Sequence, residues 1–376
     1  MRNVVVFDVL VVYTESQCVS AGDSMRAKTP FRQDGVSSSY NVVYGYFLEI
    51  CRRNGLRAAL TTSADVVGPG ECSSYWTYTD KRWIRVKGRC KAEVIFDKFS
   101  PTRAKIKRAR QLLFSSDRIR PFNDPELFAI FFDKLQTYES LSGFAIPTLA
   151  LLGGDRSSVS TACKQLTNMQ DESMIADFDD EIVLKDRFGA GGRRVYKFGS
   201  SETDKIVATL ARHPNNMFVI QPLAKFDQGF IHEGRRSPVD IRLIFLRGKI
   251  VQTYIRIAKT DDFRCNEHQG GKLKYIAISA IPDTVIKQAY LVAEKLDKEQ
   301  SFFALDFIVC NSGRVYLLEG NTGPGLDWNL DLPKNEKEAK RLIRLVVGDL
   351  RLMAESNTSL VDSKEEEIAA ASYLGA

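Results

Sequence analysis

Apolar and polar positions follow two patterns along the chain, short apolar runs of strand length and a helical periodicity. Apolar runs of strand length lie at Val4–Val12, Leu56–Thr61 and Ala92–Phe99, and a helical pattern at Tyr40–Arg53 ends before Gly55. Strands that alternate with helices indicate α/β layering. We therefore expect residues 1–122 to form an N-terminal α/β domain.

A second region begins with Asn123-Asp124-Pro125-Glu126, where a capping side chain, a proline in the first turn and an early acid predict a helix start. Strands expected at 181–185 and 194–198 flank the loop Gly189-Ala190-Gly191-Gly192. A hairpin with a glycine loop between short helices indicates an α+β subdomain, which we place at 123–222.

The pattern after residue 222 is dominated by hairpins. Two are expected, at 240–258 and at 302–319, and they assign 223–355 to a C-terminal α+β core. A helix is predicted from Leu332 to Met353. The acidic, alanine-rich segment 356–376 is expected to be a flexible tail.

Composition narrows the class of protein. The 376 residues include 53 basic and 47 acidic side chains, and a net charge of +6 does not indicate a nucleic-acid or membrane partner. Seven cysteines without a CxxC pair argue against a disulfide framework or a zinc site, and they favour a cytoplasmic protein. No apolar run approaches the ~20 residues of a membrane span. Oligomeric state cannot be read from these features.

Two acidic residues face each other in the second predicted hairpin. If Ser312-Gly313 forms a two-residue turn, Asp306 lies directly across from Glu319, and Asn321 points to the same side of the sheet. Opposed like charges are destabilising, and a bound cation would remove that cost. Two carboxylates and an amide suit Mg²⁺. The alternative is an exposed acidic hairpin whose register differs by one residue.

Upstream residues could meet phosphate groups. Lys185 follows an apolar strand and precedes the glycine loop, in which Gly189, Gly191 and Gly192 allow backbone N–H groups to turn toward an anion. Lys134 lies on an apolar helical stripe, which is unusual for a lysine whose head reaches only water. The alternatives are an ordinary hairpin turn and a lysine that snorkels to solvent.

Further polar groups follow the first hairpin. Arg256 alternates with apolar neighbours, so its guanidinium leaves the apolar face of its strand. Arg264 and Asn266 could bind phosphate oxygens. His268 lacks the spacing of a metal ligand and Cys265 lacks a histidine to activate it, so we expect neither to be catalytic.

Taken in their order along the chain, these phrases resemble the RimK-like branch of the ATP-grasp superfamily, which is related to glutathione synthetase. The resemblance covers about residues 123–328. It rests on Phe132-Asp133-Lys134-Leu135, Val183-Leu184-Lys185 with the glycine loop, Val219-Ile220-Gln221-Pro222, Asp240-Ile241-Arg242, Arg264-Cys265-Asn266, and Asp306 with Glu319 and Asn321.

The resemblance implies an ATP-grasp fold, in which two α+β subdomains clasp ATP behind an N-terminal α/β pre-ATP-grasp domain. It also implies that ATP contacts Lys134, Lys185, Gly189, Gly191, Gly192, Gln221, Pro222, Leu223, Asp240, Arg264 and Asn266. Asp306, Glu319 and Asn321 would hold one or two Mg²⁺ ions, with Mn²⁺ as a substitute, and Arg256 and Arg264 would be catalytic. The implied activity is an ATP-dependent carboxylate–amine ligase, which forms an acyl phosphate of a small-molecule or peptide acid and releases ADP and phosphate.

Two departures from the family pattern bear on this reading. Pro222 replaces an acid that the family often has at the hinge, and the stretch 225–238 is longer than usual, as a substrate-facing loop would be. The alternatives are an ATP-grasp phosphotransferase and a non-catalytic ATP-binding interaction protein. A basic run at 103–110 leaves nucleic-acid binding as a further, weaker alternative.

Overall fold

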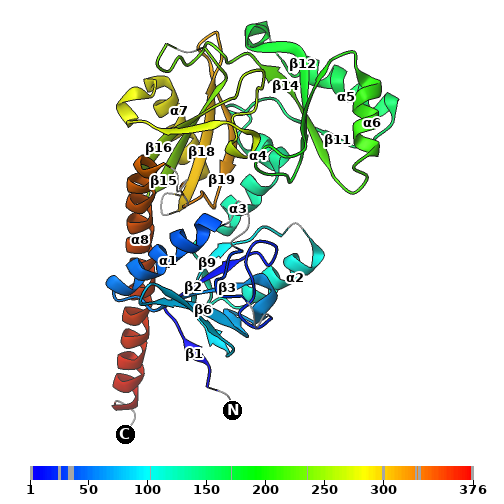
Figure 1. The fold of residues 1–376 in the computed structure, drawn as a ribbon. Coiled ribbons are helices and arrows are strands. Elements are labelled where there is room, and N and C mark those ends of the chain that lie inside the picture. The colour runs from blue at the N-terminus through cyan, green and yellow to red at the C-terminus, as the bar shows by residue number, and fades with distance from the viewer. Residues whose placement is uncertain are drawn as a thin grey trace. The chain divides into compact units, whose positions relative to one another are not determined.

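The computed structural model describes residues 3–23, 27–32, 38–101, 103–170, 172–234, 236–298, 301–326, 328 and 332–373. The chain divides into two compact units, each with its own sheets and helices (Figure 1). The first unit consists of residues 1–123 and 325–376, and the second of residues 124–324.

The main sheet of the first unit has six strands in the order β10-β9-β2-β3-β6-β7. Their bounds are β2 Val9–Tyr13, β3 Ala58–Thr62, β6 Tyr75–Thr79, β7 Arg82–Val86, β9 Val94–Lys98 and β10 Arg120–Pro121. Strand β2 is buried along its whole length and pairs in parallel with β3 and β9 on either side. A central parallel strand is buried on both faces, so its sequence is a continuous apolar run. The parallel strands, together with the helices of this unit, confirm the α/β prediction for this region.

A smaller sheet lies beside it in the first unit, in the order β1-β8-β5-β4. Its strands are β1 Val5–Val6, β4 Val66–Gly68, β5 Glu71–Cys72 and β8 Cys90–Lys91. The single strand expected at Val4–Val12 is therefore wrong, because it divides between two sheets. The division falls at Asp8, whose carboxylate accepts the backbone N–H of Arg57 at 2.6 Å.

Helices of the first unit are α1 Ser38–Arg53, α2 Ala104–Leu113 and α8 Pro333–Tyr373. Helix α8 packs on α1, and Arg344 donates to the Tyr46 hydroxyl at 2.9 Å. It continues past the predicted end at Met353, through a segment rich in glutamate and alanine, which are strong helix formers. The second unit ends at Pro324, so residues 325–355 of the expected core at 223–355 belong to the first unit instead.

The second unit contains two antiparallel sheets. One has the order β11-β14-β12-β13, with strands β11 Leu149–Leu151, β12 Phe178–Asp186, β13 Val195–Gly199 and β14 Phe218–Ala224. The other has the order β17-β16-β15-β18-β19, with strands β15 Val239–Leu246, β16 Lys249–Ile257, β17 Lys272–Tyr275, β18 Phe302–Val309 and β19 Val315–Asn321. This arrangement confirms the α+β prediction, although the expected boundary after residue 222 falls inside β14.

In the described residues of the second unit, five α-helices accompany these sheets. They are α3 Pro125–Phe132, α4 Lys134–Ser140, α5 Arg156–Asn168, α6 Thr203–Ala211 and α7 Asp283–Leu296. Short 3₁₀ helices lie at Glu172–Asp177, Glu267–Gln269 and Ile278–Ala280 in this unit, and at Ser63–Asp65 in the first unit. Helix α3 begins as predicted, because Asp124 caps it and Pro125 occupies its first turn. Figure 1 shows α5 and α6 beside the first sheet and α7 beside the second.

The five-stranded sheet has one apolar and one charged face near its centre. Ile241 and Leu243 of β15 pack with Leu305 of β18 and Val285 of α7 in one buried cluster. Because successive side chains of a strand point to opposite faces, the residues between them on β15 face away from this core. These include the charged side chains that build the site described below.

No helix within the described part of the chain is long and apolar enough to cross a membrane.

Candidate active site

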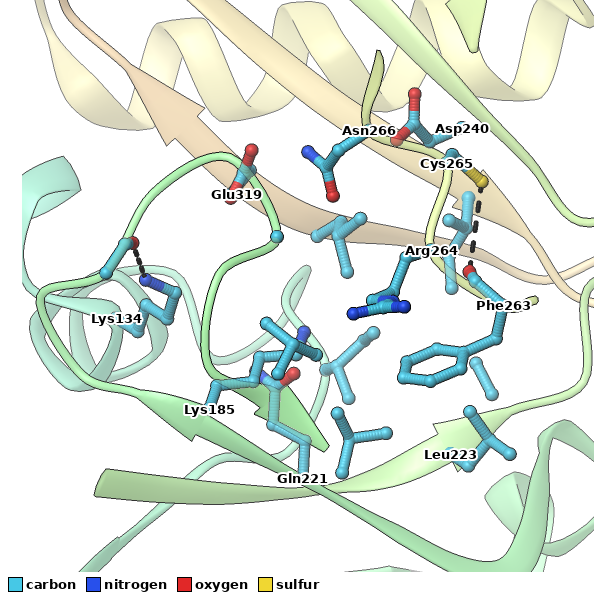
Figure 2. Close-up of a pocket in the computed structure, with 18 of the residues that line it drawn as sticks. Lys134, Lys185, Gln221, Leu223, Asp240, Phe263, Arg264, Cys265, Asn266 and Glu319 are labelled. Atoms are coloured by element: carbon cyan, nitrogen blue, oxygen red, sulfur yellow. Dashed lines mark hydrogen bonds between the residues drawn. The ribbon is translucent and has the colours of Figure 1, made fainter. Parts of the chain in front are cut away.

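Residues from both sheets of the second unit line one pocket (Figure 2). Of the predicted site residues it is lined by Lys134, Lys185, Gly189, Gly191, Gly192, Gln221, Pro222, Leu223, Asp240, Arg264, Asn266 and Glu319. Arg256, Asp306 and Asn321 do not line it. The structure therefore brings together the residues predicted to contact a nucleotide, while it separates two of the three predicted metal ligands from the pocket.

Two lysines bring positive charge to the pocket wall. Lys185 lies near the end of β12, and Lys134 begins α4, where its ammonium donates to the Gly189 carbonyl. Burial lowers the pKa of Lys185 to about 8 and also lowers the pKa of Lys134, and Glu319 opposes both shifts. A lowered lysine pKa means that the surroundings do not fully compensate the ammonium charge. An anion in the pocket would supply that compensation.

The glycine loop is held on both sides. Arg187 donates Nε and Nη2 to the two oxygens of Asp133 at 2.7 and 2.6 Å, while the Gln269 amide donates to the Gly191 carbonyl at 3.3 Å. Gly191 and Gly192 have φ values of +66° and +69°, which side-chain-bearing residues rarely adopt. The loop is thus fixed beside the lysines by its flanking contacts, and its glycines permit the turn.

Gln221 presents a hydrogen-bond acceptor to the pocket. The Thr148 hydroxyl donates its single proton to the Ile146 carbonyl at 2.8 Å, so toward Gln221 it can only accept. It accepts from Gln221 Nε2 at 2.7 Å, and this fixes the orientation of the amide. The other amide atom, Oε1, is buried and has no donor among the described residues. Since buried polar atoms are rarely left unpaired, a ligand that donates a proton here would complete the pair.

The opposite wall carries Arg264 and Asn266. Figure 2 shows the guanidinium of Arg264 in the middle of the pocket, beside the ring of Phe263. Asp262 orients it by accepting from Nε at 3.0 Å and from Nη2 at 2.9 Å. These hydrogen bonds raise the pKa of Arg264, so the group stays charged.

The predicted pairing of Asp306 with Glu319 is confirmed, but the predicted turn is wrong. Cys310 donates its N–H to Arg314, so the loop holds three residues, with Gly313 at φ +92°. The ladder shifts by one residue between Asp306 and Phe307, where Leu318 forms a bulge. The longer loop and the bulge offset each other, and the two acids remain opposite.

Two arginines compensate Asp306, one of the two opposed acids. Arg242 donates to both oxygens of Asp306, with Nε at 2.5 Å from Oδ1, and Arg256 Nη2 donates to Oδ2 at 2.6 Å. Arg256 also donates Nε to Asp240 at 2.7 Å. Arg242 of β15 lies directly across from Asp306 of β18, and Asp240 of β15 lies directly across from Arg256 of β16. The pair of Arg256 with Asp306 spans β15, which lies between their strands.

These four charges are almost completely buried. Burial alone would raise the pKa of Asp306, but the two guanidinium groups outweigh it and hold that pKa well below its ordinary value. For Asp240, burial dominates and raises the pKa, against the opposing effect of Arg256. Arg242 was absent from the predicted site residues. The alternation of Asp240 and Arg242 along β15 was the sequence signal that could have identified it.

The predicted role of Arg256 needs correction. Its guanidinium leaves the apolar face of β16 as expected, but it binds Asp240 and Asp306 and does not reach the pocket. Asn321 is also engaged, since its amide oxygen accepts the Gly323 N–H at 2.8 Å.

The residues present fit a metal ion only in part. Glu319 lines the pocket with a side chain that is 34% exposed, and Arg242 approaches it only to 3.7 Å. Asp306 is adjacent, but it already accepts three hydrogen bonds. Within the described ranges no group of three or more His, Cys, Asp or Glu side chains is arranged to hold a metal. Glu319 is therefore the carboxylate best placed for a divalent ion.

Comparisons with known proteins show a family and a fold. Residues 154–343 match the family model of the RimK-like ATP-grasp domain. A probable alpha-L-glutamate ligase of Histophilus somni is 25% identical over 240 residues, which cover 62% of this chain and 70% of the relative.

Two solved structures share the fold. D-alanyl-alanine synthetase A of Vibrio cholerae superposes with a TM-score of 0.56 at 15% identity, covering 93% of this chain and 99% of its own. The ATP-grasp ligase PsnB, in a complex with a variant of its minimal precursor, Mg and ADP, superposes with a TM-score of 0.50 at 12% identity, covering 92% and 99%. At these identities the likeness concerns the fold alone.

We predict that Arg242→Met strongly destabilises the second unit, because it leaves Asp306 buried with one cationic partner fewer. Loss of one partner from a buried pair costs roughly 3–5 kcal/mol. The three tryptophans all lie in the first unit, so tryptophan fluorescence would not report on unfolding of the second. The free energy of unfolding is therefore measured in urea by circular dichroism.

Arg264→Met is the matched control, since Arg264 forms a more exposed pair with Asp262 and should cost at most about 1 kcal/mol. Equal losses in the two variants would contradict the structural importance of the buried network.

Proposed function

Since the chain belongs to the RimK-like ATP-grasp family, and is therefore an ATP-binding ligase that forms C–N bonds, we propose that it works through an acyl phosphate. A carboxylate oxygen of the acid attacks the γ-phosphorus of ATP, the bond from that phosphorus to the bridging oxygen breaks, and ADP leaves. The nitrogen of an amine then attacks the acyl carbon, the carbon–oxygen bond to phosphate breaks, and the amine loses a proton. The products are an amide, ADP and phosphate.

The observation that carries this proposal is the pair of under-compensated lysines beside the glycine loop. Lys134 and Lys185 provide cationic donors for the phosphates, and Arg264 reaches the same pocket from the other sheet. Phosphoryl transfer needs little covalent chemistry from the protein and relies on positioning and charge stabilisation. The pocket supplies both from groups that are already held in place.

Of the two predicted catalytic arginines, Arg264 is the better placed. Its guanidinium enters the pocket, whereas Arg256 is bound to Asp240 and Asp306. We assign Arg264 to the transferring phosphoryl group. Arg256 acts indirectly, by holding the carboxylates behind Glu319.

Glu319 would hold Mg²⁺ in this scheme. Asp306 and Asn321 would complete the predicted set if Asp306 gave up one arginine contact and Asn321 released the Gly323 N–H. When bound, one or two Mg²⁺ ions, or Mn²⁺ in their place, would neutralise phosphate charge. Such hard oxygen ligands are those that Mg²⁺ prefers.

The acid and the amine are a small molecule or a peptide. The name of the Histophilus somni relative makes glutamate the first amine to test. The loop 225–238, which was predicted to face the substrate, packs on the hairpin turn of β18 and β19, where Asn311 donates to Asp227 at 2.8 Å and accepts from Gln228 at 2.9 Å. Arg235 of that loop lies outside the described residues.

The ligase activity is tested by phosphate release from ATP with panels of acids and amines. We expect release to require Mg²⁺ and both substrates, and to fall by at least about 100-fold in Glu319→Ala, as for loss of a group that stabilises transition-state charge. Glu181→Ala is the control. Glu181 of β12 pairs with Lys197 of β13 at 3.0 Å and does not line the pocket.

Unchanged turnover in Glu319→Ala would exclude the metal assignment. A stable phosphorylated product formed without any amine would instead identify a phosphotransferase.

Gln221 should select the adenine base. Its buried acceptor can pair with the exocyclic amine of adenine, whereas the carbonyl oxygen of guanine at the same position would repel it. We expect Gln221→Met to weaken ATP binding by about tenfold, as for loss of one buried hydrogen bond, and to leave the weaker GTP binding nearly unchanged.

Thr148→Val should also reduce the preference for ATP, because it frees the amide of Gln221 to rotate. Calorimetric titration of both nucleotides measures the ratio. A ratio that stays constant in both variants would contradict this role.

ATP affinity should depend on pH through Lys185. Its pKa of about 8 means that the ammonium form, which phosphate needs, predominates below pH 8 and is lost above it. We expect the Kd for ATP to rise about twofold between pH 7 and 8, and above pH 8 by up to about tenfold per pH unit, the limit for one linked proton. A slope that persists unchanged in Lys185→Met would assign it to another group.

A further inference from the structure

A second cleft lies within the first unit. It has a volume of about 580 Å³, within the usual range for a small-molecule site. Its polar lining includes Lys91, Ser116, Arg118 and Arg120, and Val6 and Ile119 contribute apolar surface. We propose that this cleft binds the anionic group, a carboxylate or a phosphate, of a small molecule, with Arg120 as the principal donor.

Arg120 is the side chain that points most directly to a ligand. Its backbone is fixed in β10, where its N–H donates to the Glu93 carbonyl at 2.7 Å. Its Nη1 donates to the Ser356 hydroxyl at 3.2 Å, but its Nε is buried and has no acceptor among the described residues. A guanidinium donates best as a fork to two oxygens of one carboxylate or phosphate. The edge formed by Nε and Nη2 therefore suits an oxyanion.

The neighbouring groups have the chemistry to assist. Lys91 and Arg118 are exposed cations on the lining. The Ser116 hydroxyl accepts the Arg118 N–H at 3.4 Å, which leaves its own proton to donate. A ligand oxygen could thus meet a hydroxyl and more than one cation.

The acidic side chains on the lining do not cancel this preference. Asp8 accepts the Arg57 N–H at 2.6 Å, and Glu93 has a partner of its own. The lining thus carries three cations against two carboxylates, and its net positive charge favours an anionic ligand.

The charge of the surrounding segment acts in the same direction. Residues 1–123 contain 21 lysines and arginines against 11 aspartates and glutamates, a formal charge of +10, while the whole chain carries +6. The rest of the chain is therefore net negative, by −4. A concentrated positive field raises the local concentration of anions and speeds their arrival.

The experiment is calorimetric titration of the full chain at constant ionic strength, with inorganic phosphate in one arm and acetate in the other. It uses the Lys185→Met background, so that phosphate binding in the second unit does not contribute. We expect saturable binding in at least one arm. The arm that saturates identifies the phosphate or the carboxylate as the natural group.

Arg120→Gln should weaken that binding at least tenfold. Arg82→Gln is the control, because it removes the same charge from an exposed position on β7 and should change the affinity by less than twofold. No saturation in either arm, or equal losses in the two variants, would overturn the proposal and leave only long-range attraction.

Folding is checked by the melting temperature without ligand. If Arg120→Gln does not fold, Arg118→Gln decides the matter, since Arg118 is exposed on the same lining. A loss of at least threefold supports the site, and an unchanged affinity overturns it.

Discussion

The second unit depends on four buried charges that compensate one another. Asp240 and Arg242 of β15, Arg256 of β16 and Asp306 of β18 have side chains that are 8% exposed or less, and their desolvation is costly. The cost is met only when these three strands pair in the observed register, because a slip by one residue would turn each charged side chain to the other face. The network therefore favours a single register. That register also fixes where Glu319 of the neighbouring strand enters the pocket.

The two faces of this sheet have separate roles. Ile241, Leu243 and Leu305 pack with α7 and supply apolar burial on one face, while the charges between them on the same strands supply the geometry of the other. The charged network and Glu319 are thus carried by strands, whereas Arg264 and Asn266 reach the pocket from the loop that follows β16. The adjoining glycine loop is less regular and needs extra contacts, such as the pair of Arg187 with Asp133, to hold its place.

How much of the site could be predicted depended on two bulges. Alternation and residue order identified the pocket residues and the strands. Counting from a two-residue turn paired Asp306 with Glu319 correctly only because a longer loop and the bulge at Leu318 offset each other. The same counting from Arg247-Gly248 would place Asp240 opposite Ile255. A bulge at Val251 moves it opposite Arg256 instead, and nothing in the local sequence announces that shift. Alternation therefore gave the face of Arg256 correctly, but only the folded register could give its partner.

The pocket itself argues for a cation, independently of the number of protein ligands around it. Lys134 and Lys185 attract phosphate groups from one wall, whereas Glu319 faces the same space and repels them. Without phosphates, Glu319 stabilises the charged form of both lysines, because its carboxylate opposes the lowering of their pKa values. Once phosphates neutralise the lysines, this stabilisation is no longer needed and the Glu319 carboxylate faces negative charge. The site is partly buried, so the repulsion is several-fold larger than in water. A divalent ion between Glu319 and the phosphates would convert this repulsion into two attractions. The charges that the pocket brings together therefore favour the proposed divalent ion at Glu319, even while Asp306 remains bound to its arginines.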